Sequence, residues 1–360
     1  MPTIPLADTR AQYAPVLDEV MEAFRGVLES GRFIFGPNVK AFEDEAAEFL
    51  GVPETIGVAN GTDAIVIVLD ALGVGPGDEV ICPAFTFYAT AESIARRGAT
   101  PVFADIDPLT LNLDPEDVAA KVTDRTRALM PVHLFGRVMP LQGLTELGIP
   151  IIEDAAQAYG AEGVAQVGAL STFSFFPTKN LFALGDGGLV AATDQELADR
   201  VALLRFHGSR DKNDFEAVGY NSRLDELQAA VLRLFLGEID GWNAARREAA
   251  ARYEELGLGE LCELPADEPG HVYHMYVVRS PERDRFREAL AAAGIGHASY
   301  YVVPLHLQPA LRYLGWKEGS LPETEKAAAE NLALPMWAGI PAETQQRVVS
   351  VIREAAAVRA

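Results

Sequence analysis

One lysine stands out in the stretch FSFFPTKNLFALGDGG, residues 173–188. Lys179 follows a dense aromatic and apolar run and precedes a turn that contains three glycines. An apolar setting disfavours the charged form of a lysine and lowers its pKa, and a neutral amine can form a Schiff base with a carbonyl compound. The alternative is a lysine that pairs with a structural carboxylate, which explains the charge but not the aromatic run before it.

The motif EDAAQ, residues 153–157, places two carboxylates directly after the apolar run IPII. Glu153 and Asp154 are adjacent, so in an extended chain they point to opposite faces and do not form a paired acid–base site. Because an unpaired buried carboxylate is costly, we expect at least one of them to have a cationic partner. A helix-capping aspartate is the alternative.

Two further motifs have the residue types of a phosphate site. NGTDA at 60–64 offers Gly61 and Thr62 at a strand-to-helix turn, where backbone N–H groups and a hydroxyl favour an anion. GYNSRLDELQAAVL at 219–232 opens a long helix with Asn221 and Arg223 at its start. Plain helix capping, by the NGT residues in the first motif and by Ser222 in the second, explains both motifs as well.

Short apolar runs that alternate with helical patterns must position these motifs. The predicted strands are 55–59, 79–83, 100–107, 127–136 and 149–157, with helices between them, such as those near 88–97 and at 140–147. This alternation predicts an α/β fold whose mostly parallel sheet is covered on both faces. Ligands of such sheets bind beyond the carboxyl ends of the strands, so we expect the motifs to meet there.

Helical patterns flank this region, and a smaller α+β unit follows it. The flanking helices are predicted at 12–30, which Gly31 closes, and at 38–50, 194–206, 222–238 and 241–256. After a connector at 264–271 come a strand in HVYHMYVVRS, a helix at 282–293, a strand near 297–302, and helices at 322–333 and 341–358. We therefore expect a large domain over residues 1–240 and a small one over 241–360.

Composition excludes several classes of protein. The chain has 360 residues and a net charge of −22, which argues against nucleic acid and anionic membranes as partners. Its two cysteines make neither a disulfide framework nor a metal cluster, so we expect a reducing cytoplasm and no metal. MPTIPLADTR does not have the pattern of a signal peptide, and no apolar run approaches a membrane span. The first strand is not followed by G-x-G-x-x-G, which argues against a dinucleotide-binding dehydrogenase.

Taken in order, the motifs strongly resemble those of the sugar aminotransferases of the DegT/DnrJ/EryC1/StrS family. The most specific pieces are EDAAQ, SFFPTKN with GDGG, and YNSRLDELQAA, and the resemblance runs from SGRFIFGPNV at 30–39 to LALPMWAGI at 332–340. It implies the aspartate aminotransferase fold (fold type I), the cofactor pyridoxal 5'-phosphate (PLP), and a cytoplasmic homodimer with shared active sites.

The resemblance also implies a role for each matching residue. Lys179 matches the lysine that holds the cofactor as a Schiff base and then moves a proton as general base and acid. Asp154 matches the acid that bonds the pyridine nitrogen, and Gln157 matches a residue near the ring hydroxyl. The remaining cofactor residues are Gly61, Thr62 and Ser174 for the phosphate, Phe87 for the ring face with Phe85 as fallback, and Asn221 for the phosphate of the partner subunit.

For the substrate, the resemblance implies amino transfer from glutamate to a keto-sugar nucleotide, with release of 2-oxoglutarate. The forms of NGTDA and YNSRLDELQAA favour C3 of a dTDP- or UDP-linked hexose. The alternatives are the 4-keto branch, a non-sugar PLP transaminase, and a catalytically inactive regulatory protein that kept the fold. A dehydratase branch has histidine in place of the lysine, so Lys179 argues against it.

Six residues are candidates for contact with this substrate. Local cations must offset the anionic surface before a sugar diphosphate can bind, and Tyr300 and Tyr301 match a family loop near the sugar. Phe182 stands where the family usually has glycine, and we expect it either to narrow the site or to displace the turn. The candidates are Arg32, Phe182, His207, Arg223, Tyr300 and Tyr301.

Overall fold

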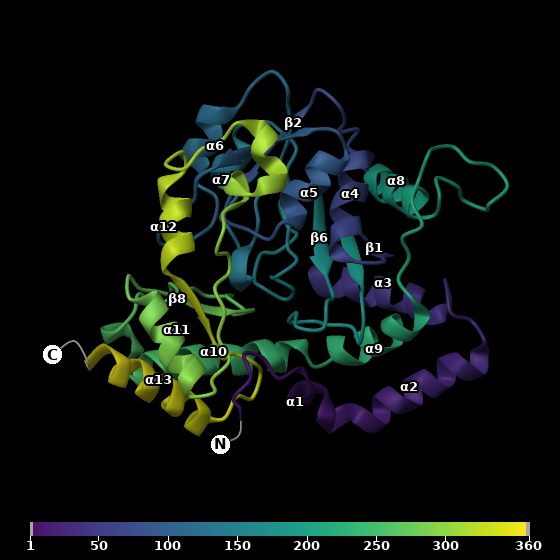
Figure 1. Cartoon of the computed structure of the whole chain (residues 1–360). Coiled ribbons are helices and arrows are strands. Elements are labelled where there is room, and N and C mark those ends of the chain that lie inside the picture. The colour runs from purple at the N-terminus through teal and green to yellow at the C-terminus, as the bar shows by residue number, and fades with distance from the viewer. Residues whose placement is uncertain (1–2, 358–360) are drawn as a thin grey trace.

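The structure, a computed structural model, describes residues 3–357 and is built around a twisted sheet (Figure 1). A four-stranded sheet has the order β1-β7-β6-β5 and a three-stranded sheet the order β3-β2-β4. Parallel bridges from Leu129 to Ile151 and from Val132 to Asp154 join β4 to β5 and make the two sheets continuous. The strands are β1 (Glu54–Val58), β2 (Glu79–Pro83), β3 (Thr100–Ala104), β4 (Thr126–Leu129), β5 (Ile152–Asp154), β6 (Leu170–Ser174) and β7 (Gly188–Ala192).

All strands of this sheet are parallel except β7, which pairs antiparallel with both β6 and β1. The mostly parallel α/β sheet predicted from the sequence is therefore confirmed, with one reversed strand. Because β7 is reversed, it begins at the edge where β6 ends, with Ser174 opposite Gly188. The β6–β7 connection, which carries Lys179, consequently lies at the carboxyl ends of the parallel strands.

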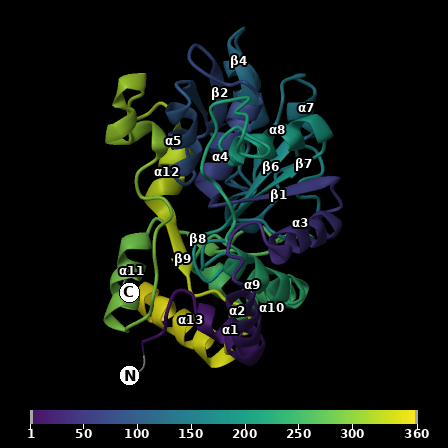
Figure 2. The ribbon, with the colours of Figure 1, turned by 90° about the vertical axis from the view of Figure 1, so that its right-hand side faces the viewer.

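Helices cover both faces of the sheet (Figure 2). Along β7, Val190 packs in one core cluster with Ile67 of α4, whereas Leu189 packs in another with Phe42 of α3 and Phe235 of α9. One face is covered by α4 (Gly61–Ala71), α5 (Ala89–Arg96) and α8 (Gln195–Arg205), and the other by α3 (Pro37–Leu50), α6 (Pro115–Lys121), α7 (Gln142–Thr145) and α9 (Glu226–Leu236). Successive strand residues face opposite layers, as period-two alternation requires.

Helix ends follow local capping rules, with one correction. After α1 (Thr9–Tyr13), helix α2 (Leu17–Ser30) ends at Gly31 in the left-handed conformation, φ 64, as the sequence predicted. Helix α9 begins at Glu226, later than the predicted 222, so Ser222 does not cap it. The Ser222 hydroxyl instead accepts a hydrogen bond from the Ala59 N–H at 3.0 Å, just after β1. The buried Glu226 carboxylate accepts the N–H groups of Asn38 and Val39 at the start of α3.

The C-terminal part forms a second core. Strands β8 (Tyr276–Arg279) and β9 (Asn331–Leu334) pair antiparallel and pack with α10 (Ile239–Glu255), α11 (Arg283–Ala292) and α13 (Ala342–Ala357). The predicted strand near 297–302 is wrong, because there only Ala298 forms a bridge, to Ala333. Its place is taken by β9, which follows α12 (Pro322–Glu330) and which the sequence pattern had merged into one helix. Residue 358 of the last predicted helix lies outside the described residues.

The chain crosses between the two cores more than once. Leu305, Leu311 and Leu321 pack in the same cluster as Phe103 of the large sheet, although they follow β8 in the chain. The domain division at residue 240 stays a prediction. Within residues 3–357 no helix is both long and apolar enough to span a bilayer.

Phe182 is part of the core and not of a substrate site. Its side chain is fully buried, with ring centroids 4.8 Å from Phe235 and 5.5 Å from Trp242. A side chain with no accessible surface offers no atom to a ligand. This placement corrects the expectation that Phe182 narrows the site and contacts the substrate.

We predict that Phe182→Ala lowers the free energy of unfolding by about 3–5 kcal/mol, because it leaves a cavity between α9 and α10. Urea denaturation followed by circular dichroism measures the change. The control is Tyr313→Ala, where the side chain is 68% exposed and lies outside the cavity, and the loss should stay within about 0.5 kcal/mol. Equal losses in the two variants would contradict the assignment of Phe182 to the core.

Candidate active site

A cavity of about 420 Å³ opens beyond the carboxyl ends of β1, β5 and β6. This is the edge at which parallel sheets bind ligands. Nine of the residues singled out in the sequence line it: Gly61, Thr62, Phe87, Asp154, Gln157, Ser174, Lys179, Tyr300 and Tyr301. The fold thus gathers motifs that are up to 240 residues apart in the chain, as Gly61 and Tyr301 are.

The start of α4 forms one wall of the cavity. The Asn60 side chain caps the helix by accepting the N–H of Asp63 at 2.8 Å, so the first two helical residues are Gly61 and Thr62. A Cβ on Gly61 would come within 2.7 Å of the Ser174 Cβ, and only glycine fits this approach. The N–H groups of a first helical turn have no acceptor within the helix, and the helix dipole favours an anion there. Gly61, Thr62 and Ser174 therefore form a wall of the cavity at which an anionic group such as a phosphate can be bound.

Asp154 ends β5 and is 4% exposed. Its Oδ2 accepts the Thr90 hydroxyl at 2.9 Å, and its Oδ1 accepts the Ala156 N–H at 3.3 Å. Burial raises the pKa of this carboxyl, although both hydrogen bonds and the charge of Lys179 act in the opposite direction. Among the described residues Asp154 forms no ion pair, so a cationic ligand group would relieve the cost of its charge.

The β6–β7 connection holds Lys179 in place. The Phe175 N–H bonds the Gly187 carbonyl at 2.8 Å, and the Lys179 N–H bonds the Phe176 carbonyl at the same distance. The next residue, Asn180, is buried and donates its amide to the carbonyl of Val272 at 2.9 Å. Burial lowers the pKa of Lys179 to about 8, against the opposing charge of Asp154. The neutral amine predicted from the apolar surroundings is thus accessible near neutral pH.

Gln157 and Tyr301 connect on the wall next to Asp154. The Gln157 amide donates to the Tyr301 hydroxyl at 3.2 Å, while its oxygen accepts the Phe135 N–H at 2.8 Å. The Tyr301 ring lies 6.3 Å from the Phe87 ring, which is 58% exposed at the cavity mouth. Phe85 is fully buried and does not line the cavity, so of these two phenylalanines only Phe87 is accessible to a ligand.

Besides Phe182, four predicted residues do not line the cavity of this single chain. Arg32, His207 and Asn221 are exposed, and Arg223 is half-buried. Arg32 adjoins the exposed apolar segment at 33–35. His207 and Asn221 lie at the base of the segment between α8 and α9, where the His207 N–H bonds the Tyr220 carbonyl at 2.8 Å. This segment loops out from the rest of the chain (Figure 1). Their placement leaves the predicted roles of these residues untested within one subunit.

Sequence reasoning missed two residues of the site. Thr90 lies in the first turn of α5 and holds Asp154, and it belongs to the PAFTFYAT motif that was noted only for its aromatics. His274 lines the cavity just before β8, in HVYHMYVVRS, which was interpreted only as a strand. The only sequence signal for either residue was a polar side chain within an apolar run: Thr90 in PAFTFYAT and His274 in HVYHMYVVRS.

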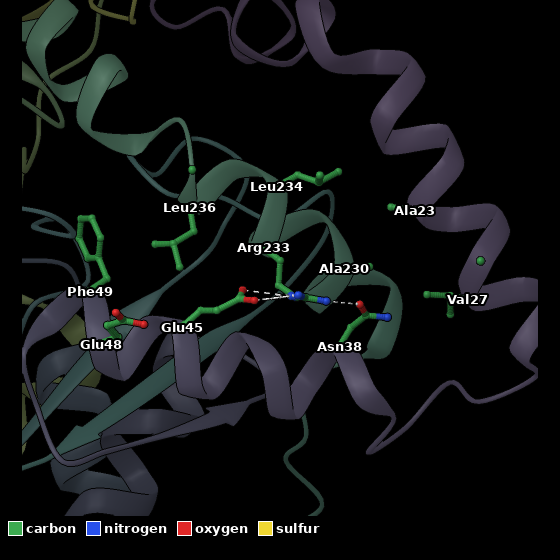
Figure 3. Close-up of a pocket in the computed structure, with 12 residues that line it drawn as sticks. Ala23, Val27, Asn38, Glu45, Glu48, Phe49, Ala230, Arg233, Leu234 and Leu236 are labelled. Carbon is green, nitrogen blue, oxygen red and sulfur yellow. Dashed lines mark hydrogen bonds and ion pairs between the residues drawn. The ribbon is translucent and has the colours of Figure 1, made fainter.

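A second and more open cavity, of about 800 Å³, lies between α2, α3 and α9 (Figure 3). Arg233 is the one cation in its lining, and the guanidinium contacts the Glu45 carboxylate at 2.7 Å and the Asn38 amide oxygen at 2.9 Å. Ala23, Val27 and Leu234 supply apolar surface. None of the candidate catalytic or cofactor-binding residues lines this cavity, so the first cavity is the candidate active site.

Comparison with known proteins adds independent findings. The DegT/DnrJ/EryC1/StrS aminotransferase family profile matches residues 16–353. A Geobacillus stearothermophilus protein named pleiotropic regulatory protein is 47% identical, with 98% of each chain covered. The Acidithiobacillus ferrooxidans UDP-N-acetyl-3-dehydro-alpha-D-glucosamine 3-aminotransferase is 41% identical, with 97% of each chain covered.

Two further comparisons concern Streptomyces venezuelae. Its dTDP-3-amino-3,4,6-trideoxy-alpha-D-glucose transaminase is 41% identical, covering 98% of this chain and 96% of the relative. The crystal structure of S. venezuelae DesV in complex with a ketimine intermediate superposes with a TM-score of 0.95 at 42% identity, with 98% of each chain covered.

We predict that the Lys179 amine of the cofactor-free protein reacts with trinitrobenzenesulfonate with a midpoint near pH 8. Only the neutral amine is nucleophilic, and a lowered pKa populates it from about pH 8 upward instead of near 10.5. Peptide mapping by mass spectrometry follows the modification of each lysine. Lys40 is the internal control, because its hydrogen bond to Asp44 raises its pKa and should delay its reaction. Parallel pH profiles for Lys40 and Lys179 would contradict the prediction.

Proposed function

The chain belongs to the DegT/DnrJ/EryC1/StrS aminotransferase family, and from that premise we propose that it moves an amino group from glutamate to the C3 ketone of a dTDP- or UDP-linked hexose. The observation that carries the proposal is the meeting of Lys179 and Asp154 in one cavity beside the phosphate seat at the start of α4. Support for C3 comes from the UDP-sugar and dTDP-sugar relatives, both of which are named for chemistry at a sugar C3.

The cofactor of this aminotransferase is PLP, and the residues present fit it. The carboxyl of Asp154 is buried and has no ion-pair partner among the described residues, so a protonated ring nitrogen would stabilise its charged form. The close approach of Gly61 to Ser174 at the start of α4 leaves N–H groups that would bind the cofactor's phosphate. The Lys179 amine would react with the cofactor's aldehyde carbonyl. When bound, PLP supplies an electron sink for the negative charge that develops at the amino donor's α-carbon.

The chain's own residues then account for proton transfer. The carboxylate of Asp154, which Thr90 and the Ala156 N–H hold in position, would keep the cofactor's ring nitrogen protonated. The Lys179 Nζ would accept the proton from the amino donor's α-carbon as general base and donate it to the cofactor as general acid, which requires a pKa near the working pH. A pKa of about 8 meets that requirement before ligands add their own charges.

The regulatory name of the 47% identical relative supports a second candidate function, a PLP-fold regulator without turnover. The retained Lys179 and Asp154 favour the enzyme. The absorption spectrum of the PLP-loaded protein distinguishes the two, because glutamate converts the cofactor only in a competent aminotransferase. We also propose a cytoplasmic location, which suits the two free cysteines at positions 82 and 262.

We propose further that the chain forms a homodimer with shared sites. At the cavity mouth Phe87 and Phe176 are more than half exposed, and Phe33 and Phe35 add exposed aromatic surface near Arg32. Such aromatic surface favours association. Under this proposal Asn221 reaches the phosphate of the partner subunit, and Arg32, His207 and Arg223 are cations available to the sugar diphosphate.

Subunit sharing predicts complementation. Lys179→Ala and Asn221→Ala proteins are each expected to be inactive, but after exchange half of the dimers are hybrids with one intact site. The mixture should recover about a quarter of wild-type activity per subunit. Native mass spectrometry of differently tagged subunits confirms exchange. If exchange is complete and activity stays absent, each subunit carries its own whole site.

The reverse reaction tests the substrate, because 3-keto sugars are fragile. PLP-loaded enzyme is incubated with 2-oxoglutarate and either a 3-amino or a 4-amino sugar nucleotide, and glutamate is measured. We expect glutamate from the 3-amino compounds alone. Glutamate from the 4-amino compounds alone would overturn the C3 assignment. Glutamate from neither, with simple amines accepted, would overturn the sugar-nucleotide proposal.

A further inference from the structure

His274 lines the cavity on a segment that two other parts of the chain hold in place. The Val272 N–H bonds the Gly136 carbonyl at 3.0 Å, and the Val272 carbonyl accepts the amide of Asn180, next to Lys179. A Cβ on Gly136 would come within 2.8 Å of the His274 nitrogen, so the two segments touch at the backbone. His274 is thereby fixed relative to Lys179.

The His274 imidazole has no hydrogen-bond partner in the described protein. It is 4% exposed, and neither Nδ1 nor Nε2 has a partner among residues 3–357. Buried polar groups in folded proteins are nearly always paired, and those that are not call for an explanation. His274 lines a ligand cavity, so the missing hydrogen bond is explained if a bound ligand supplies the partner.

The charges around this imidazole are positive. Arg246 is 2% exposed and donates to the carbonyls of Tyr273 and His274 at 3.3 and 3.5 Å and to the Gln12 amide oxygen at 3.1 Å. It has no carboxylate partner among the described residues. Burial, Lys179 and Arg246 all lower the pKa of His274, so the ring is neutral and one nitrogen carries a proton to donate.

We propose that His274 binds a carboxylate of the amino donor. The proposal rests on the proposed aminotransferase function and deepens it by assigning the donor's subsite. A neutral imidazole donates one N–H to a carboxylate, and the positive charge of Arg246 behind it favours an anion. The phosphate seat at Gly61 and the acid Asp154 occupy other parts of the cavity lining, and Asp186, its other acid, is exposed.

The test compares two amines on the same PLP-loaded enzyme. Glutamate carries carboxylates, whereas a 3-amino sugar nucleotide carries none unless its sugar is an acid, so a neutral hexose is used. We expect His274→Leu to weaken the apparent affinity for glutamate about ten- to a hundredfold in stopped-flow absorbance, and to leave the response to the sugar nucleotide unchanged. His274→Asn keeps an N–H donor and should recover part of the loss.

Binding of glutarate, a dicarboxylate that cannot react, gives a readout that is independent of turnover. Calorimetry should show weaker glutarate binding to His274→Leu holoenzyme, while its thermal unfolding stays unchanged or rises, because no protein hydrogen bond is lost. The matched control is His306→Leu, a buried histidine outside the cavity that bonds Glu325 at 3.0 Å. It should lower the unfolding temperature and leave glutarate binding unchanged.

Each failure has its own signature. Wild-type glutarate affinity in His274→Leu, or equal losses toward glutamate and the sugar nucleotide, would overturn the assignment of His274. If wild-type holoenzyme responds to neither amine, the proposed aminotransferase function fails. The glutarate titration then still tests whether His274 binds a carboxylate.

Discussion

The site depends on the cost of removing charge from water at one edge of the sheet. Burial raises the pKa of Asp154 and lowers that of Lys179, so each side chain is driven toward its neutral form. They act on each other through space without an ion pair, and two fixed donors, Thr90 and the Ala156 N–H, hold the carboxylate. A direct salt bridge would neutralise both groups and leave nothing for a ligand to satisfy.

The reversed strand β7 makes this arrangement sterically feasible. Strand β6 ends at the ligand edge five residues before Lys179, and because β7 runs antiparallel to it, the whole β6–β7 connection stays at that edge instead of crossing the sheet. The approach is close, since a Cβ on Gly188 would come within 2.5 Å of the Asn60 carbonyl group. Glycine at this position is therefore a steric requirement of bringing the lysine hairpin against the start of α4, and not simply a flexible turn.

How much the sequence could predict follows from the range of the interactions. Strand runs such as EVICP are apolar because both faces of the sheet are covered, so their type and position were readable from local pattern. Strand β9 was lost because α12 continues into it without a break, and only pairing with β8 at long range makes it a strand. The prediction that Ser222 caps α9 was wrong for the same reason, because the hydrogen-bond partner of Ser222 is Ala59, which lies 163 residues away in the chain.

Substrate residues were the least predictable because burial and charge, not motif, decide them. Phe182 stands in the lysine motif itself, yet its ring turns into the core against Trp242, whereas Tyr301, 122 residues after Lys179, reaches the cavity and bonds Gln157. His274 was invisible in an alternating strand pattern, because the pattern reports which face is buried and not whether a buried polar group is paired. Pairing is a property of the assembled site. Two of the candidate ligand-binding residues, His274 and Asp154, have hydrogen bonds or charges that the fold leaves incomplete, and this can be established only when every neighbour is in place.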